Sequence, residues 1–274
     1  MLHAVLVAGL RYLFGMANVR PHLIMRAGHS DVALCLRKRL CGSREGRAME
    51  PSLEDAAKRV VGYTAVDRFV RDGTCIGLGT GTTAYWAVQR VGELIASGWR
   101  LRAIPTSLAT ERQCRELGIP LVALGDEPLD VALDGADEAA PDRSLIKGGG
   151  GALFREKAVA LAARTFVAIV TERKLVQQLG AFPLPVEVVP FSAHYVGREI
   201  EAMGAAVTAR LQGGKAFVSD NGNAILDCAF DSIRQPAALD MRLRALHGVV
   251  ATGLFVGIAS VVMVAKLDRS IAQF

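Results

Sequence analysis

Apolar and polar residues follow two different periods from residue 52 onward. Apolar residues spaced three or four apart predict helices, whereas short apolar runs rich in β-branched residues predict buried strands. Helices are predicted at 52–70, 82–96, 107–118 and 152–163. Strands are predicted at 74–79, 101–105, 129–135 and 165–170. Because strands and helices alternate, we expect an α/β fold, with a mostly parallel sheet covered by helices on both faces.

The pattern changes after 182–190, an extended segment that contains three prolines. The next predicted elements are helices at 192–203 and 237–246 and strands near 205–211, 215–219 and 224–228, with apolar strands from Val249. This order predicts a second, smaller α+β domain, after which the last strands return to the first sheet. We therefore expect one domain at 49–180 plus 254–274 and another at 181–253.

An uncharged stretch at 248–265 has the minimum length for a membrane-spanning helix. Gly253 and Gly257 divide it into short runs rich in β-branched residues, as in buried strands. We favour strands and expect no membrane association.

Charge is unevenly distributed along the chain. The net charge is +5, but residues 1–50 hold eight of the 32 basic and three of the 27 acidic residues. The remainder is balanced, so it offers no basic surface that would favour nucleic acid. We interpret residues 1–48 as an extension, either a disordered segment or an upstream mis-start with translation beginning at Met49. Organellar targeting is the alternative.

The segment "GLGTGTTA" (77–84) joins a predicted strand to a predicted helix. Its glycines and the N–H groups at the helix start suit an anion, and Thr80, Thr82 and Thr83 add hydroxyl groups. It lacks the lysine of a Walker A loop, and no acid follows at the distance that a dinucleotide site requires. A small phosphate site and a tight turn with a threonine cap remain as alternatives.

Two further segments carry candidate chemistry. "DGAD" (134–137) ends a buried strand, where α/β sheets bind ligands, although a solvated Asx-type turn gives the same pattern. In "KGGGGALFREK" (147–157), four glycines lead into a helix whose backbone N–H groups a sugar oxygen can approach. Glu156 lies one turn inside that helix. The alternatives are a surface cation for Lys147 and an ordinary first-turn acid for Glu156.

Histidine and cysteine give little support for other chemistry. His194 and His247 are expected near helix ends, so a carboxylate of raised pKa would have to carry proton transfer. The five cysteines show no disulfide framework and no metal-ligand spacing, so free, mostly buried thiols and no metal site are expected.

Seven segments, in order, resemble the type A ribose-5-phosphate isomerase family. They are "GLGTGTTA", "IPTSLAT", "DVALDGADE", "LIKGGGGALFREK", "LGAFPLPVEVVP", "SDNGNAILD" and "GVVATGLF". The resemblance implies a Rossmann-like domain with a smaller α+β domain. It also implies interconversion of ribose 5-phosphate and ribulose 5-phosphate through an enediolate, without cofactor or metal.

The same resemblance implies roles for single residues. Glu156 matches the general base, Asp134 the acid for ring opening, and Asp137 and Lys147 the groups that bind and polarise sugar oxygens. The remaining expected substrate-binding residues are Thr80, Gly81, Thr82, Thr83, Gly135, Ala136, Gly148, Gly149, Gly150 and Lys174. Glu138 and Asp142 have no assigned role and are expected in solvent.

Family membership would also imply a cytoplasmic homodimer or homotetramer whose partner is a small sugar phosphate. Two other functions stay open. A sugar-phosphate sensor would usually carry a DNA-binding module, which residues 1–50 do not offer. A nicotinamide-dependent dehydrogenase would require the missing ribose-binding acid.

Overall fold

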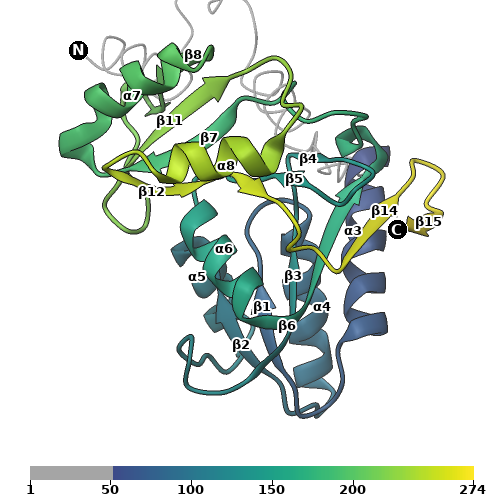
Figure 1. Ribbon diagram of the computed structural model, residues 1–274. Helices are drawn as coiled ribbons and strands as arrows, with labels where there is room; N and C mark the ends of the chain where they lie inside the picture. Colours follow the sequence, from purple (N-terminus) through teal and green to yellow (C-terminus); the bar gives the residue numbers. More distant parts are fainter. Residues whose placement is uncertain (1–51) are drawn as a thin grey trace, which may run out of the picture. The chain divides into compact units, whose positions relative to one another are not determined.

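A six-stranded sheet is the largest element of residues 52–274, the part of the chain that the computed structural model describes (Figure 1). The strand order is β15-β14-β6-β3-β1-β2, and every neighbouring pair is parallel except β14 and β15. The strands are β1 (Cys75–Leu78), β2 (Arg102–Pro105), β3 (Leu129–Asp134), β6 (Ala163–Thr171), β14 (Val261–Ala265) and β15 (Ile271–Gln273). The interpretations of residues 1–48 lie outside the described residues.

Four helices connect or flank these strands, as the sequence predicts. They are α3 (Leu53–Phe69), α4 (Ala84–Ala96), α5 (Leu108–Glu116) and α6 (Leu153–Ala162). The hydroxyl of Ser52 accepts from the N–H of Asp55, and the hydroxyl of Ser107 accepts from the N–H of Thr110. Both serines thus satisfy backbone donors at the first turn of a helix, which fixes where α3 and α5 begin.

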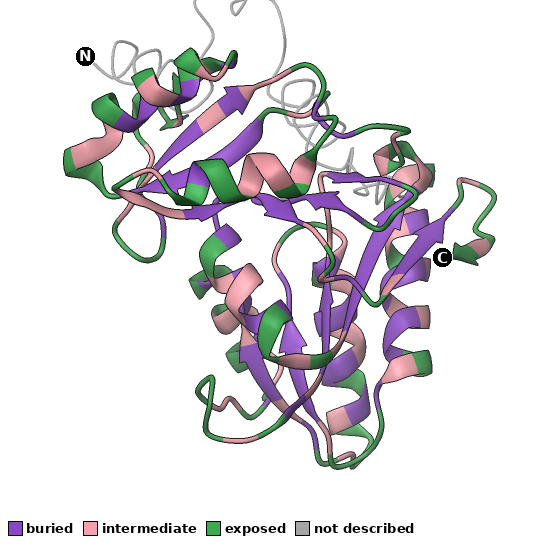
Figure 2. Ribbon diagram, in the orientation of Figure 1, coloured by how far each residue is buried: buried purple, intermediate pink, exposed green. Residues whose placement is uncertain are grey.

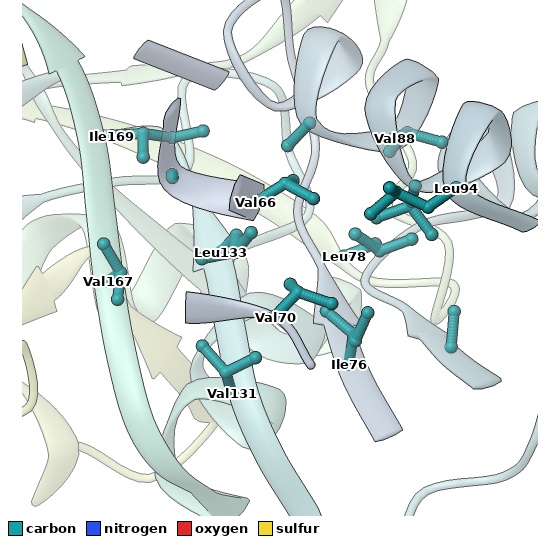
Figure 3. Packing of buried hydrophobic residues seen from close by; sticks show 14 of the residues in the cluster. Val66, Val70, Ile76, Leu78, Val88, Leu94, Val131, Leu133, Val167 and Ile169 are labelled. Carbon is teal, nitrogen blue, oxygen red and sulfur yellow. The ribbon is translucent and has the colours of Figure 1, made fainter. Parts of the chain in front are cut away.

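Side chains alternate between the two faces of the parallel sheet. Figure 3 shows one face, where residues of β1, β3 and β6 meet apolar residues of α3 and α4. On the other face, Phe166 and Val262 pack against Val159 of α6 and against Phe255. The sheet is therefore buried on both sides, which its nearly continuous apolar strands require (Figure 2).

A four-stranded antiparallel sheet, ordered β12-β7-β11-β8, confirms the change of pattern after residue 181. Its strands are β7 (Leu184–Val188), β8 (Ala206–Ala209), β11 (Ala224–Ala229) and β12 (Val249–Thr252). Helices α7 (Ala193–Ala202) and α8 (Pro236–Arg244) pack on it through Val196, Ile200 and Leu243. The chain is thus an α/β fold with a mostly parallel central sheet and additional antiparallel sheets; its division into two domains stays a prediction.

Five short strands of two residues each complete the fold of residues 52–274. β13 (Leu254–Phe255), β5 (Leu145–Ile146) and β4 (Glu138–Ala139) form a three-stranded antiparallel sheet. β9 (Leu211–Gln212) and β10 (Lys215–Ala216) form a hairpin, which overlaps the strands predicted near 205–211 and 215–219. β13 lies within the apolar strands predicted from Val249, whereas β4 and β5 were not predicted, because strands of two residues show no periodicity.

The stretch 248–265 is confirmed as strands, because it supplies β12, β13 and β14. Within residues 52–274, none of the helices combines the length and the apolar character that crossing a bilayer requires. Cys75, Cys114 and Cys228 are buried free thiols, as expected, whereas the other two cysteines lie outside the described residues.

Candidate active site

The candidate site lies at the carboxyl ends of three adjacent parallel strands, β6, β3 and β1. The loops that follow these strands meet at one edge of the sheet, which is where α/β folds bind ligands. They surround a cavity of about 390 Å³. It is lined by Glu54, Lys58, Thr80–Thr83, Gly135–Asp137, Lys147–Gly150, Glu156, Thr171, Arg173 and Lys174. Every predicted site residue except Asp134 lines this cavity.

Asp134 lies behind the cavity wall and joins the loops after β3 and β1. Its Oδ1 accepts hydrogen bonds from the backbone N–H groups of Thr80 (3.1 Å) and Gly135 (2.7 Å). A Cβ atom on Gly79 would come within 2.1 Å of that oxygen, so only glycine allows the carboxylate to approach. The glycine in this loop is thus explained by the position of Asp134.

The structure separates the three threonines of the loop after β1. The Thr80 hydroxyl lies 2.8 Å from the hydroxyls of Thr106 and Ser107, so it already has hydrogen-bond partners within the protein. Thr82 and Thr83 line the cavity. Thr83 precedes α4, but its side chain makes no capping hydrogen bond, so the alternative of a threonine cap is not supported.

Lys147 lies between two carboxylates and is not a surface cation. Its Nζ is 3.0 Å from Oδ2 of Asp134 and 3.1 Å from Oε2 of Glu156, and the three side chains are at most 4% exposed. Nζ donates to the carbonyl of Gly135 at 2.6 Å. Among the described residues, neither carboxylate oxygen that faces Nζ receives a hydrogen bond of good geometry. Lys147 Nζ is thus the partner that both buried oxygens face.

Burial and charge shift the pKa values of these three groups. Burial raises the pKa of Glu156 to about 8, which the Lys147 ammonium opposes and the Asp134 carboxylate reinforces. Burial also raises the pKa of Asp134, against the effect of Lys147. Burial alone would lower the pKa of Lys147, but the carboxylates of Asp134 and Glu156 raise it above its ordinary value. The predicted carboxylate of raised pKa is thus present, and its neighbour is a permanent cation.

The glycine run forms a turn that opens α6 toward the cavity. Gly148 and Gly151 have φ angles of 99° and 84°, which favour glycine, and the N–H of Gly151 donates to the carbonyl of Gly148. The N–H of Gly149 donates to Oδ2 of Asp137 at 2.7 Å. Ala152 at the helix start supplies no side-chain cap.

Four residues that line the cavity were not predicted from the sequence. Glu54 and Lys58 belong to α3, Thr171 is the last residue of β6, and Arg173 lies in the 3-10 helix Glu172–Lys174 that follows it. Arg173 Nε lies 3.4 Å from Oε2 of Glu54, and the Thr171 hydroxyl donates to Oε1 of the same carboxylate. Together with Lys174, Lys58 and Arg173 make this part of the wall rich in cations. The sequence feature that could have indicated Arg173 is its position next to Lys174, which was predicted to bind substrate.

The expectation that Glu138 lies in solvent is wrong. Its side chain is buried, and its two oxygens accept the backbone N–H groups of Gly180 and Phe182. Glu138 therefore anchors the segment before β7. Asp142 is exposed, as expected, and accepts from the N–H of Ser144.

Neither His194 nor His247 lines the cavity. Within residues 52–274, no group of three or more histidine, cysteine, aspartate or glutamate side chains is arranged to hold a metal ion. Fold and site together define an α/β protein with a loop rich in glycine and threonine beside a buried cluster of one lysine and two carboxylates.

Comparison with known proteins identifies the family within this class to which the chain belongs. Residues 102–269 match the family model of ribose 5-phosphate isomerase A, also called phosphoriboisomerase A. Ribose-5-phosphate isomerase A 1 of Oceanobacillus iheyensis is 44% identical over 218 residues, which cover 79% of this chain and 97% of that protein. The chain therefore belongs to the ribose 5-phosphate isomerase A family.

Solved structures agree with this assignment. The ribose 5-phosphate isomerase from Plasmodium falciparum matches with a TM-score of 0.78 and 35% identity, covering 80% of this chain and 98% of that one. A D-ribose-5-phosphate isomerase in complex with phospho-erythronic acid matches with a TM-score of 0.78 and 34% identity over 80% and 98% of the two chains. The resemblance inferred from the sequence is thus confirmed.

Proposed function

We propose that the cavity at the ends of β1, β3 and β6 is the active site, with Glu156 as its general base. The chain is an isomerase of the ribose 5-phosphate isomerase A family, which interconverts D-ribose 5-phosphate and D-ribulose 5-phosphate. The observation that carries the assignment of the base is the buried Glu156–Lys147–Asp134 cluster beside the glycine run.

The proposed reaction moves one proton between two carbons. The ionised Glu156 takes the proton from C2 of the open-chain aldose, and the bonding electrons form a C1–C2 double bond while O1 becomes an oxyanion. A proton passes from O2 to O1, and Glu156 returns its proton to C1, which leaves the ketone at C2. No other reactant is required. A glutamate whose pKa is raised by burial suits both halves of this transfer.

Lys147 and Asp137 are the proposed partners of the sugar oxygens. The Lys147 ammonium keeps its charge and lies beside the base, so it stabilises the negative charge that develops on O1 and O2. The carboxylate of Asp137 is half-exposed on the cavity wall and is oriented by Gly149. It accepts a sugar hydroxyl in this proposal.

Asp134 is proposed as the acid for ring opening. Burial raises the pKa of Asp134, which is the direction that an acid requires, and its Oδ2 faces Lys147 without a hydrogen bond of good geometry from the described residues. It does not line the cavity, so its proton would reach the ring oxygen through a hydroxyl or a water. The contacts of Asp134 also hold Lys147 and the loop after β1 in place.

The phosphate group is assigned to the loop at 81–83 and to the cations opposite it. The α4 helix begins in this loop without a side-chain cap, so its N-terminal N–H groups favour an anion. Lys58, Arg173 and Lys174 supply positive charge on the same cavity. A homodimer or homotetramer in the cytoplasm remains our expectation for the assembled enzyme.

Conversion of ribose 5-phosphate by the purified protein tests the proposed function. We expect ketose to form equally well with and without EDTA, and the equilibrium mixture to be the same from either sugar phosphate. Absence of ketose from a folded sample would contradict the proposal. Binding of ribose 5-phosphate and DNA without turnover would instead support the alternative of a sensor.

A further inference from the structure

Arg210 is a buried cation of the antiparallel sheet that reaches back to the active-site loop. It lies between β8 and β9, with its side chain 12% exposed. Its guanidinium forms a bidentate ion pair with Asp227 of β11, in which Nε donates to Oδ2 at 2.9 Å. Its backbone N–H donates to the carbonyl of Ile225. Both the backbone and the side chain of Arg210 are therefore held by β11.

The remaining nitrogen of this guanidinium binds the glycine run. Nη1 donates to the carbonyl of Gly148 at 2.9 Å and to that of Gly149 at 3.1 Å. Phe217, whose ring lies 5.8 Å from the guanidinium carbon, fills the space beside Gly151. A Cβ atom on Gly151 would come within 2.3 Å of that ring. Two side chains that flank the β9–β10 hairpin thus contact the turn that precedes α6.

These contacts determine where the amide groups point. A trans peptide is planar, with its C=O and N–H directed oppositely. Arg210 binds the carbonyl of Gly148, while Asp137 accepts the N–H of Gly149 on the opposite side. In the next peptide, Arg210 binds the carbonyl of Gly149, so the N–H of Gly150 points away from the guanidinium. Gly150 lines the cavity, and its N–H has no acceptor among residues 52–274.

We propose that Arg210, held by Asp227, is a positioning residue that aims the Gly150 N–H at the oxyanion of the enediolate. The inference rests on the proposed function and assigns this reaction a residue outside the cavity. Its charge also polarises the peptide whose carbonyl it binds, which strengthens the N–H as a donor. The donor is oriented before substrate arrives, so its full effect appears where negative charge develops on the sugar.

The variant Arg210→Met keeps much of the side-chain volume and removes all donors. We expect kcat to fall about 10²-fold, the effect of losing one oxyanion donor, while KM for ribose 5-phosphate changes less than about threefold. The inhibition constant of phospho-erythronic acid should rise in parallel with the loss of kcat, because its carboxylate presents the two oxygens of the enediolate. Inhibition by inorganic phosphate should stay unchanged, since the loop at 81–83 is untouched.

Controls separate this role from a structural one. Arg164→Met removes an exposed arginine that also faces an aspartate, Asp130, but contacts no glycine of the run; it should leave all four constants unchanged. Arg210→Lys should resemble Arg210→Met, because one ammonium cannot replace the bidentate fork and the carbonyl contacts together. If Arg210→Met does not fold, Arg210→Lys and Asp227→Asn are measured in its place, and both should lose kcat.

Wild-type turnover is measured first, so that failure of the proposed function is recognised separately. If the wild type converts ribose 5-phosphate and a folded Arg210 variant keeps its kcat within about twofold, the positioning role is overturned. It is also overturned if phosphate and phospho-erythronic acid weaken to the same extent, which would indicate general loosening of the site.

Discussion

Two carboxylates share one ammonium group in the active site, since Asp134 and Glu156 lie 3.0 and 3.1 Å from Nζ of Lys147. Each would be costly to bury alone, because desolvation disfavours the charged form. The pKa of Glu156 is therefore set by burial against the charge of Lys147, and its value of about 8 leaves the base close to its working pH. Residue type and spacing predicted these participants, but only the fold brings Asp134 to Lys147.

This balance predicts the pH dependence of kcat/KM. The base must be ionised in the free enzyme, and Glu156 is protonated below about pH 8, so kcat/KM should fall about tenfold per pH unit below that value and level off above it. Measurement between pH 6.5 and 9.5 avoids the second ionisation of the substrate phosphate at about 6.

Lys157 provides the control for this profile. Burial lowers its pKa to about 8 as well, and its Nζ lies 3.2 Å from the hydroxyl of Thr252, away from the cavity lining. In Lys157→Met, kcat/KM should still fall below about pH 8, as in the wild type. If this fall disappears in Lys157→Met, or if kcat/KM of the wild type does not change across the range, the assignment to Glu156 is contradicted.

Two short strands, β5 and β13, join the apolar cores of the two larger sheets. Leu145 and Phe255 point into the core beneath the parallel sheet, whereas their neighbours Ile146 and Leu254 point into the core of the antiparallel sheet. Because successive side chains of a strand point to opposite sides, this one pair of strands contributes to both cores. Lys147 follows β5 directly, and its N–H donates to the carbonyl of Gly253, so this lysine is fixed at the junction of the two cores.

Leu254→Ala tests whether the two cores depend on each other. The side chain is 1% exposed, so its truncation should lower the free energy of unfolding by about 2–5 kcal/mol. Both tryptophans, Trp86 and Trp99, belong to the parallel-sheet part of the chain. Their fluorescence should nevertheless report the lower urea midpoint, in one transition that coincides with far-UV circular dichroism.

The matched control is Leu161→Ala, because Leu161 is 63% exposed and its truncation should change stability little. A separate early transition in circular dichroism, with the tryptophan midpoint unchanged, would show that the antiparallel sheet unfolds on its own. That outcome would contradict the shared core.

The fold was predictable where local rules determine it. Serine caps set the starts of α3 and α5, and glycines divide 248–265 into strands. The candidate site was predictable where its residues follow strands that are also neighbours in the sheet. Lys58 was not, because a lysine one turn after Glu54 has the pattern of an exposed helix face, and only the contact of α3 with β6 brings it to the cavity.

The contacts of Arg210 and Glu138 were likewise not predictable from the sequence. Nothing near Arg210 in the sequence indicates that it binds the glycine run some sixty residues earlier. Glu138 follows the two aspartates proposed to act on the substrate, yet its partners are backbone N–H groups of Gly180 and Phe182. Both residues act through tertiary contacts that close long loops, which composition and periodicity do not encode.

Glu156→Gln with ribose 5-phosphate in deuterated water tests the proposed mechanism most directly. Glutamine keeps the shape of the side chain but cannot accept the C2 proton, so turnover and deuterium incorporation, followed by proton NMR, should both fall by about 10² or more. Binding of ribose 5-phosphate should persist. Turnover close to that of the wild type, with solvent deuterium still appearing at C1 of the product, would show that another group moves the proton.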